Sequence, residues 1–288
     1  MEFISTYQAQ YPITMLCKVL DFPKSTYYRA LDREPSNRQK EYEAFSQEVM
    51  AEYLKSKKRY GAGKIHKALL KRGIKCSIQR VQRHMKKQGI RSIIVKKYRP
   101  HSSKADDSGS NINILERNFA ADKAYTKLVT DITYIHVLKE GWTYLASVMD
   151  LATRKIVGYA YGRRMTADLA VQAVKNACLN IYDTEGILIH SDLGSQYTSH
   201  EFREYIESTG MIQSFSRKGN PYDNACIESF HANLKKEEVY TTTYVDFDEA
   251  GRAIFEYIES WYNRQRMHSA IDYMTPQQRE DELLAFAA

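Results

Sequence analysis

His190-Ser191-Asp192-Leu193-Gly194-Ser195-Gln196-Tyr197 opens a segment that closes with Asn220-Pro221-Tyr222-Asp223-Asn224-Ala225-Cys226-Ile227-Glu228. The apolar run from Ile187 to His190 predicts a short buried strand, which delivers Asp192 at its C-terminal end. Loops that follow strands are common places for functional groups. Glu228 is predicted to lie on a helix that begins at Pro221 or Asp223. The apolar stripe that this helix would bury is Ile227, Phe230 and Leu234.

The same helix carries a second, polar stripe at positions i, i+4, i+7 and i+11, made of Asn224, Glu228, His231 and Lys235. One helix face can therefore present an amide, a carboxylate, an imidazole and an ammonium together. Asp131 adds a third carboxylate inside the strand-like run from Leu128 to Ile135, where a charge is costly unless it is paired or binds a metal. Simpler explanations exist for each residue: an ion pair for Asp131, a turn for Asp192 and a solvated helix position for Glu228.

Strand and helix patterns alternate around these carboxylates. Runs rich in Val, Ile and Tyr with short connections predict an antiparallel meander over residues 128–135, 142–151 and 155–161. The elements predicted after it are a helix from Thr166 to about Asn180, the strand before Asp192, a helix near 200–209, a strand at 211–215, the Glu228 helix and a helix from Phe247 to Tyr262. This order predicts an α/β domain with a mixed five-stranded sheet.

The N-terminal part of the chain is predicted to be entirely helical. Ile13 to Leu20 forms one helix, Asp21-Phe22-Pro23 breaks it, and Ser25 caps a second helix that ends at Leu31. Helix, short turn, helix is the helix-turn-helix layout, although a plain packing unit explains such a pair equally well. Further helices are predicted over residues 38–54, 63–72 and 77–89, where Gly73 and Gly89 end helices and Ser77 begins one.

The predicted domain boundaries follow these changes in pattern. The divisions are a helix-turn-helix unit (1–36), a basic helical domain (37–97), a linker (98–120), the α/β domain that holds the three carboxylates (121–240) and a C-terminal helical extension of it (241–288).

Positive charge is concentrated in one part of the chain. Its net charge is +7, yet residues 55–104 hold 18 Lys and Arg and no Asp or Glu. Such a segment binds polyanions, most often nucleic acid, although a solvated surface is the alternative. In the helix after Ser77, the bases Arg80, Arg83, His84 and Lys87 lie apart from the apolar stripe, as a DNA-contacting face requires. His84 fits a phosphate contact better than a metal ligand, because no second ligand is near it in sequence.

Several protein classes are excluded by what the sequence lacks. It has no apolar run of about 18 residues and no secretory signal, so no membrane partner is expected. Its four cysteines are scattered and form no CxxC pair, which argues against a zinc site or a disulfide framework and favours a reducing cytosol.

The chemistry of the three carboxylates favours a divalent metal. Scattered oxygen ligands suit Mg²⁺, with Mn²⁺ as a substitute, and two such ions can activate an attacking oxygen and stabilise a leaving one. Together with the basic segment, Asp131, Asp192 and Glu228 predict a site that cuts and joins DNA.

From about Arg59 to Pro276 the chain resembles the IS3-family insertion-sequence transposases, specifically the IS150-like second reading frame, OrfB. The motifs that carry the resemblance are Arg59-Tyr60-Gly61, Thr130-Asp131-Ile132-Thr133-Tyr134, His190-Ser191-Asp192 with Gly194 and Gln196-Tyr197, Asn220-Pro221 with Asp223-Asn224 and Glu228-Ser229, Trp261-Tyr262-Asn263, Arg266 with His268, and Thr275-Pro276.

The resemblance implies a retroviral-integrase-like RNase H fold, with helices on both faces of the sheet. It also implies a DDE triad of Asp131, Asp192 and Glu228, with Lys235 in the family's basic position and Mg²⁺-dependent cleavage and strand transfer. The expected DNA contacts are Arg59, Arg80, Arg83, His84, Lys87, Arg91, Asn224, His231, Arg266 and His268. Trp261 and Tyr262 can contact DNA or pack in the core.

The expected partners are double-stranded DNA, as element ends and target, and other copies of the chain in a dimer or higher homo-oligomer. A fusion with the upstream-frame product is a further expectation, and the expected location is the bacterial cytoplasm at the nucleoid. Two alternatives remain at this point: a non-catalytic regulator that occupies element ends, and a structure-specific nuclease that cuts without joining.

Overall fold

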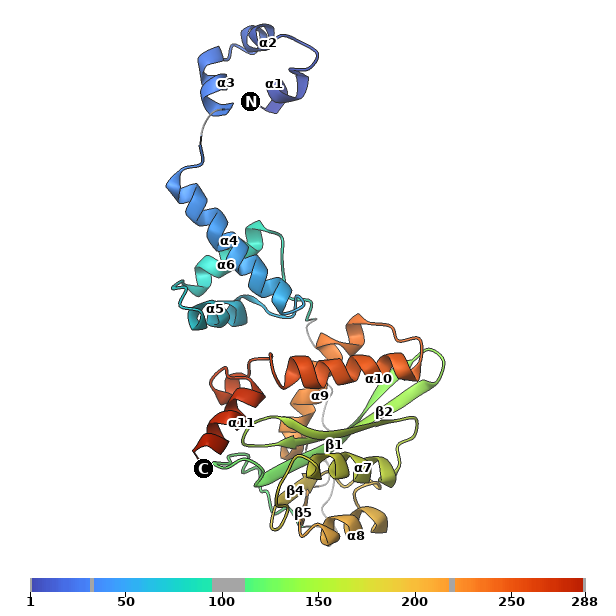
Figure 1. The fold of residues 1–288 in the computed structure, drawn as a ribbon. Helices are drawn as coiled ribbons and strands as arrows, with labels where there is room; N and C mark the ends of the chain where they lie inside the picture. The colour runs from blue at the N-terminus through green and yellow to red at the C-terminus, as the bar shows by residue number, and fades with distance from the viewer. Residues whose placement is uncertain (1, 32–33, 95–111, 218–220, 287–288) are drawn as a thin grey trace.

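The computed structural model describes residues 2–31, 34–94, 112–217 and 221–286 (Figure 1). Its first unit contains three short helices, α1 (Glu2–Tyr7), α2 (Ile13–Val19) and α3 (Lys24–Leu31). The predicted cap at Ser25 is wrong, because α3 begins at Lys24 and the Pro23 carbonyl accepts the first helical N–H bonds. Proline has its φ fixed near the helical value, so it can start a helix without a side-chain cap. The side chains that these helices bury are Ile4, Leu16, Cys17 and Tyr27.

The second unit is the basic helical domain, made of α4 (Asn37–Lys55), α5 (Ala62–Lys71) and α6 (Ile78–Lys87). The Ser77 Oγ accepts a hydrogen bond from the Arg80 N–H at 3.2 Å, which confirms the predicted start of α6. Gly73 and Gly89 have φ of 80° and 67°, so both end a helix as predicted, in a backbone region that glycine enters without strain. Apolar side chains from the three helices meet in the core, among them Phe45, Val49, Ile65, Leu69, Val81 and Met85.

The third unit is a five-stranded mixed sheet in the order β3-β2-β1-β4-β5. Its strands are β1 (Lys127–Val137), β2 (Gly141–Asp150), β3 (Ile156–Gly162), β4 (Leu188–Ser191) and β5 (Ile212–Phe215). The first three pair antiparallel, which confirms the predicted meander, while β4 pairs parallel to β1 and β5 parallel to β4. The first part of the predicted linker, up to residue 111, lies outside the described residues.

Strand lengths create a step in the sheet. β4 pairs with β1 only at Lys127, Leu128 and Val129, whereas β2 accompanies β1 to its end at Val137. Beyond Val129 the two strands therefore continue as a hairpin, and one edge of β1 has no neighbouring strand among the described residues. Asp131 lies two residues past this step.

Helices cover both faces of the sheet, as predicted (Figure 1). On one face α7 (Ala167–Cys178) and α8 (His200–Ser208) pack over even-numbered β1 residues such as Leu128. On the other face α9 (Ala225–Glu237) and α10 (Phe247–Phe255) pack over odd-numbered ones such as Val129 and Ile135. The alternation follows from the period of two in a strand. A π-helical segment, Glu256–Tyr262, continues α10 to the predicted end, and α11 (Pro276–Ala285) follows a capping box at Thr275.

Gly158 on β3 provides a test of this packing. A Cβ added there would lie 2.3 Å from the Ala177 nitrogen and 2.5 Å from the Ala173 oxygen, both backbone atoms of α7. Gly158→Ala is therefore expected to destabilise the protein by about 1–3 kcal/mol, because α7 must move away from the sheet. Gly63→Ala in α5 is the matched control, since its Cβ would meet nothing within 4 Å, and it is expected to be neutral or stabilising. Urea unfolding of both variants measures the difference, and equal midpoints would contradict it.

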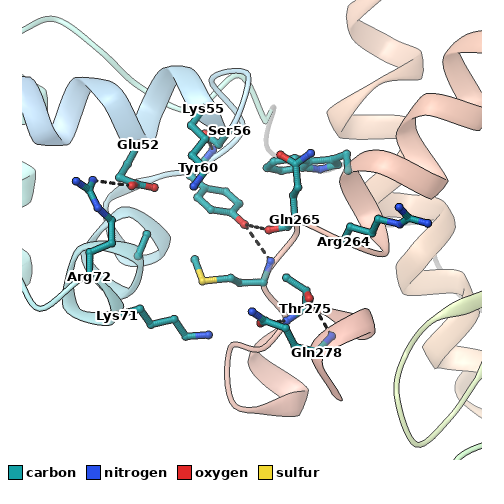
Figure 2. A pocket seen from close by; sticks show the side chains of 13 residues that line it. Glu52, Lys55, Ser56, Tyr60, Lys71, Arg72, Arg264, Gln265, Thr275 and Gln278 are labelled. Carbon is teal, nitrogen blue, oxygen red and sulfur yellow. Dashed lines mark hydrogen bonds and ion pairs between the residues drawn. The ribbon is translucent and has the colours of Figure 1, made fainter. Parts of the chain in front are cut away.

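The helical domain rests on the C-terminal part of the core. The Tyr60 hydroxyl donates to the Gln265 carbonyl at 3.1 Å and accepts from the Met267 N–H at 2.9 Å, and Figure 2 shows both bonds. A cleft of about 260 Å³ lies beside this contact, between α4, α5 and the segment that follows Tyr262. The two units therefore share buried contacts as well as a peptide connection.

Candidate active site

Asp131 is held by contacts on both of its carboxylate oxygens. Oδ1 accepts from the Ile132 N–H at 2.8 Å, and Oδ2 lies 3.3 Å from Nδ1 of His231 on α9. The other ring nitrogen of His231 lies 3.3 Å from the Ser147 hydroxyl, and Ser147 is the direct partner of Asp131 across β1 and β2. His231 thus connects α9 to β1, the strand that carries Asp131.

Asp192 follows directly after β4. Its Oδ1 accepts from the Gly194 N–H at 2.9 Å. Loss of hydration raises the pKa of this carboxyl, the Gly194 N–H lowers it, and the neighbouring Asp131 carboxylate raises it further. The two acidic groups are therefore close enough to repel each other.

The strand register explains why these two aspartates meet. Val129 pairs with His190 where β1 and β4 run parallel, so Asp131 and Asp192 each lie two residues past the same pair. Residues that pair across two parallel strands point to the same face of the sheet, and so do the residues two positions further along each strand. The buried Tyr197 hydroxyl lies 3.2 Å from Thr130 Oγ1, and burial raises its pKa first, with Asp131 and Asp192 raising it further.

Residues of the predicted polar stripe of α9 reach this pair. Burial lowers the pKa of the Lys235 ammonium while Asp131 acts in the opposite direction, which places the two charges near each other. Asn224 precedes α9 and donates from Nδ2 to the Thr130 carbonyl at 3.3 Å, while its buried Oδ1 has no hydrogen-bond partner among the described residues. Glu228 lies in the first turn of α9 and is exposed.

The described residues contain no group of three or more His, Cys, Asp or Glu side chains placed to hold a metal ion. The fold thus brings Asp131 and Asp192 together and leaves Glu228 outside a three-carboxylate cluster. The donors present are hard oxygens, and one or two carboxylates together with substrate phosphates are a usual magnesium site. The aspartate pair therefore fits this ion.

Four residues of the expected DNA-contact set are instead engaged inside the protein. Arg59 is buried, 2.6 Å from Glu238, and its guanidinium lies over the Tyr257 and Trp261 rings. His84 does not belong to the exposed face of α6, since it is buried and lies 2.7 Å from the Ser46 hydroxyl. Arg266 and His268 also lie inward, where Arg266 pairs with buried Glu237 at 2.9 Å and lies 3.2 Å from His268.

Arg59 and Arg266 each contact a carboxylate because a buried charge requires a partner. Burial and the adjacent Arg266 both lower the pKa of His268, which keeps its imidazole neutral at physiological pH. Trp261 and Tyr262 are buried as well, in agreement with the core-packing alternative. Asn224 and His231 are also buried and support the site from within.

The remaining expected contacts stay accessible on the helical domain. Arg83, Lys87 and Arg91 are exposed, and Arg80 is half-buried with an ion pair to Glu41 at 2.8 Å. These bases therefore form the part of α6 and its C-terminal loop that DNA can reach.

Asp223 has a structural role that sequence reasoning missed. Its carboxylate accepts hydrogen bonds from Arg217, Arg117 and the Asn113 amide at 2.6–3.0 Å. Burial alone would raise the pKa of Asp223, but the two arginines hold it well below its usual range. Asp223 belongs to the motif before Glu228, but the motif does not indicate its partners. The fold shows that Asp223 connects the start of α9 to the segments before β1 and after β5.

Comparisons with known proteins agree with this architecture. Residues 121–221 match the Integrase core domain family rve, residues 209–276 match the Integrase core domain family rve_3, and residues 40–98 match the HTH-like domain family HTH_21. The sheet with helices on both faces is thus the integrase-core, RNase H-like fold. None of the described helices has the length and apolar character needed to cross a membrane.

Two solved structures illustrate the structural similarity. A chain of the simian T-cell lymphotropic virus intasome is 16% identical with a TM-score of 0.47, covering 79% of this chain and 73% of that chain. The HTLV-2 integrase catalytic core domain in complex with magnesium is 15% identical with a TM-score of 0.42, covering 55% of this chain and 97% of that chain.

Sequence relatives are closer. Transposase InsF for insertion sequence IS3A of Escherichia coli strain K12 is 34% identical over 285 residues, which cover 98% of this chain and 99% of the relative. The insertion element IS600 uncharacterized 31 kDa protein of Shigella sonnei is 35% identical over 261 residues, which cover 91% of this chain and 96% of the relative. Because the identity extends over nearly its whole length, the chain belongs to the IS3 family of insertion-sequence transposases.

Proposed function

We propose that this chain binds the ends of its insertion sequence and carries out metal-dependent DNA cleavage and strand transfer, with Asp131, Asp192 and Glu228 as the DDE carboxylates. The observation that carries the proposal is that Asp131 and Asp192 each lie two residues past the paired Val129 and His190, where the Asp131 carboxylate raises the pKa of Asp192. Their side chains lie where β1 loses its neighbour, so a DNA strand can approach them at this step. The similarity to Transposase InsF for insertion sequence IS3A, which covers 99% of that relative, supports the assignment.

Asp131 and Asp192 would hold Mg²⁺, or Mn²⁺ in its place, together with phosphate oxygens of the substrate. When bound, such ions would activate the attacking oxygen and stabilise the leaving one. His231 orients the Asp131 carboxylate through Oδ2 and fixes it against Ser147. Lys235 provides a cation beside Asp131 for a substrate phosphate. Glu228 joins the carboxylate set when metal and DNA are bound.

The helical domain supplies affinity for double-stranded DNA. We assign the contact surface to Arg80, Arg83, Lys87 and Arg91. We propose domain boundaries at residues 36/37, 97/98, 120/121 and 240/241. Because two element ends must be joined to one target, the working assembly is a dimer or a higher homo-oligomer, and fusion with an upstream-frame product would add to it. Its substrate places the activity in the bacterial cytoplasm, at the nucleoid.

Separate assays of cutting and joining test the proposal. Purified protein is incubated with a labelled duplex that carries the element end, a target duplex and Mg²⁺, and both nicked and joined products are measured. A transposase gives both products only when the divalent ion is present. Tight, metal-independent binding with neither product would support the regulator, and cutting without joining would support a nuclease.

DNA affinity is expected to depend on salt and on the exposed bases of α6. Changing Arg83 and Lys87 together to Ala should weaken binding and lower the slope of log K against log salt by about 2, because each lost phosphate contact removes about 0.9 from it. Changing Lys175 and Arg252 to Ala, exposed bases of α7 and α10, provides a charge-matched control with the same assay. An unchanged slope in the α6 variant would show that this helix does not contact phosphate.

A further inference from the structure

An exposed aromatic cluster extends from the candidate site along the β1–β2 hairpin. We call Tyr134, His136, Trp142 and Tyr144 the hairpin patch. Tyr134 pairs with Tyr144 and His136 with Trp142 across the two strands, so all four side chains lie on one face. The Trp142 ring centroid lies 6.1 Å from that of Tyr134 and 5.2 Å from that of His136. Tyr134 and Trp142 are nevertheless 53% and 59% exposed.

A role in stabilising the hairpin does not fully explain why these aromatic rings are exposed and lie beside a lysine. Cross-strand aromatic pairs stabilise hairpins modestly, and they do so without a cation. Here the Lys235 ammonium lies 5.0 Å from the centroid of the Tyr134 ring, although Lys235 comes from α9 on the other face of the sheet. It can reach the ring because β4 ends at the step and leaves this edge of β1 open. The Asp131 carboxylate also acts on the pKa of Lys235, so this lysine links the patch on one face of the sheet to Asp131 on the other.

The hairpin holds these rings in a fixed position. Its turn is tied to the segment before α10, where Leu138 N–H donates to the Tyr244 carbonyl at 3.0 Å and Lys139 N–H donates to the Val245 carbonyl at 3.1 Å. The side of the sheet that carries Asp131 is anchored by α9. A fixed row of exposed rings with a cation at one end suits a nucleic acid, because its flat bases stack on the rings and its phosphates attract the cation.

We propose that the hairpin patch binds unpaired DNA bases next to the phosphodiester that the aspartate pair cuts. Rings and a lysine recognise a single strand, because its bases stack on the rings and its phosphates attract the cation. A fully paired duplex hides its base faces, so the patch would favour DNA whose terminal bases are open. This inference rests on the proposed function for the position of the cut, while the binding itself requires no chemistry.

The test uses binding without divalent ions, so that it is independent of catalysis. The probes are an element-end duplex with a short single-stranded tail that carries 2-aminopurine, and the same duplex with blunt ends. The parent protein is expected to prefer the tailed probe and to change its 2-aminopurine fluorescence by stacking. Tyr134→Ala and Trp142→Ala should each weaken tailed binding on the order of tenfold and leave blunt binding unchanged, since one base–aromatic stack contributes about 1–3 kcal/mol.

Conservative and distant variants complete the design. Tyr134→Phe and Trp142→Phe retain an aromatic ring and should keep the preference, and Tyr182→Ala removes an exposed aromatic ring that precedes β4, at the other end of the sheet. An equal loss on both probes, a preference that survives both Ala changes, or a change in oligomeric state with fluorescence intact would overturn the proposal; the last would identify the patch as a contact between copies. Failure of strand transfer with base stacking intact would refute only the proposed function.

Discussion

Asp192→Asn is expected to lower both cleavage and joining on the order of 10²–10³-fold or more, with folding and DNA affinity unchanged. Asparagine keeps the size of the side chain and an oxygen that can accept from the Gly194 N–H, which is 2.9 Å away in the parent. It removes the negative charge that a divalent ion and a developing charge at phosphate both require, and loss of one such electrostatic group typically reduces kcat by this amount. The measurement is a time course of nicked and joined products in Mg²⁺.

A nearby aspartate offers a close structural control. Asp183 is exposed, and its Oδ1 accepts from the backbone N–H two residues later, that of Glu185, at 3.1 Å. This is the same local bond that Asp192 makes with Gly194. Asp183→Asn therefore reproduces the chemical change and the turn without touching the aspartate pair, and it should retain full activity. Parental activity in the Asp192 variant would remove this residue from the proposed site.

Glu228→Gln separates a two-carboxylate from a three-carboxylate site. The same loss of products is expected, although Glu228 lies outside the aspartate pair in the structure described here. That result would require the glutamate to join the pair when DNA and metal are bound. An active Glu228→Gln protein would limit the proposed site to Asp131 and Asp192.

Local patterns were sufficient to predict most of the fold. The β-rich runs, the caps at Ser77 and Thr166 and the helix-ending Gly73 and Gly89 depend on residues within one turn or strand, and each is found where it was predicted. The position of Asp131 beside Asp192 needs the register of β1 against β4, which no local pattern contains. The motifs that carry the family resemblance predict that the two aspartates share one site.

Charge was a poor guide to surface position. Arg59, Arg266 and His84 were expected on DNA because a sequence shows their charge or polarity but not their partners. Arg59 meets Glu238 at a distance of 179 residues along the chain, and His84 meets Ser46. Only the tertiary structure shows whether a basic side chain contacts a carboxylate inside the protein or is exposed and able to bind a phosphate. The exposed alternation of Tyr134 with His136 after Asp131 was visible in the sequence, and a search for aromatic residues beside the acidic motif would have found it.

The second large effect is expected at Glu237, the buried last residue of α9. Its carboxylate accepts from Arg266 at 2.9 Å, from the Trp261 indole N–H at 2.9 Å and from the Tyr257 hydroxyl at 3.1 Å. The Glu237 backbone carbonyl also accepts from Arg59 Nε at 3.1 Å, so the network links the helical domain to α9. Glu237→Ala should destabilise the protein by about 3–5 kcal/mol, because it leaves the Arg266 charge buried without its partner.

Trp261 allows this network to be followed directly. The chain has two tryptophans, so a Trp142→Phe background leaves indole fluorescence from Trp261 alone. Urea unfolding in that background compares Glu237→Ala with Glu256→Ala, which removes an exposed pair with Lys57 and should change stability by about 0–1 kcal/mol. Similar midpoints for the two variants would show that the buried network adds little to stability.

The pH dependence of this effect has a defined sign. Burial alone would raise the pKa of Glu237, but Arg266 and the Trp261 N–H hold it below its usual value in the folded protein. A depressed folded pKa contributes stability above the unfolded value of about 4.3 and loses it as pH falls through the folded value. The stability difference between the parent and Glu237→Gln should therefore be largest near neutral pH and shrink below about pH 4. A difference that stays constant across this range would mean that Glu237 stabilises the domain contact through its shape and neutral hydrogen bonds, and that its charge has no part in holding α9 against the helical domain.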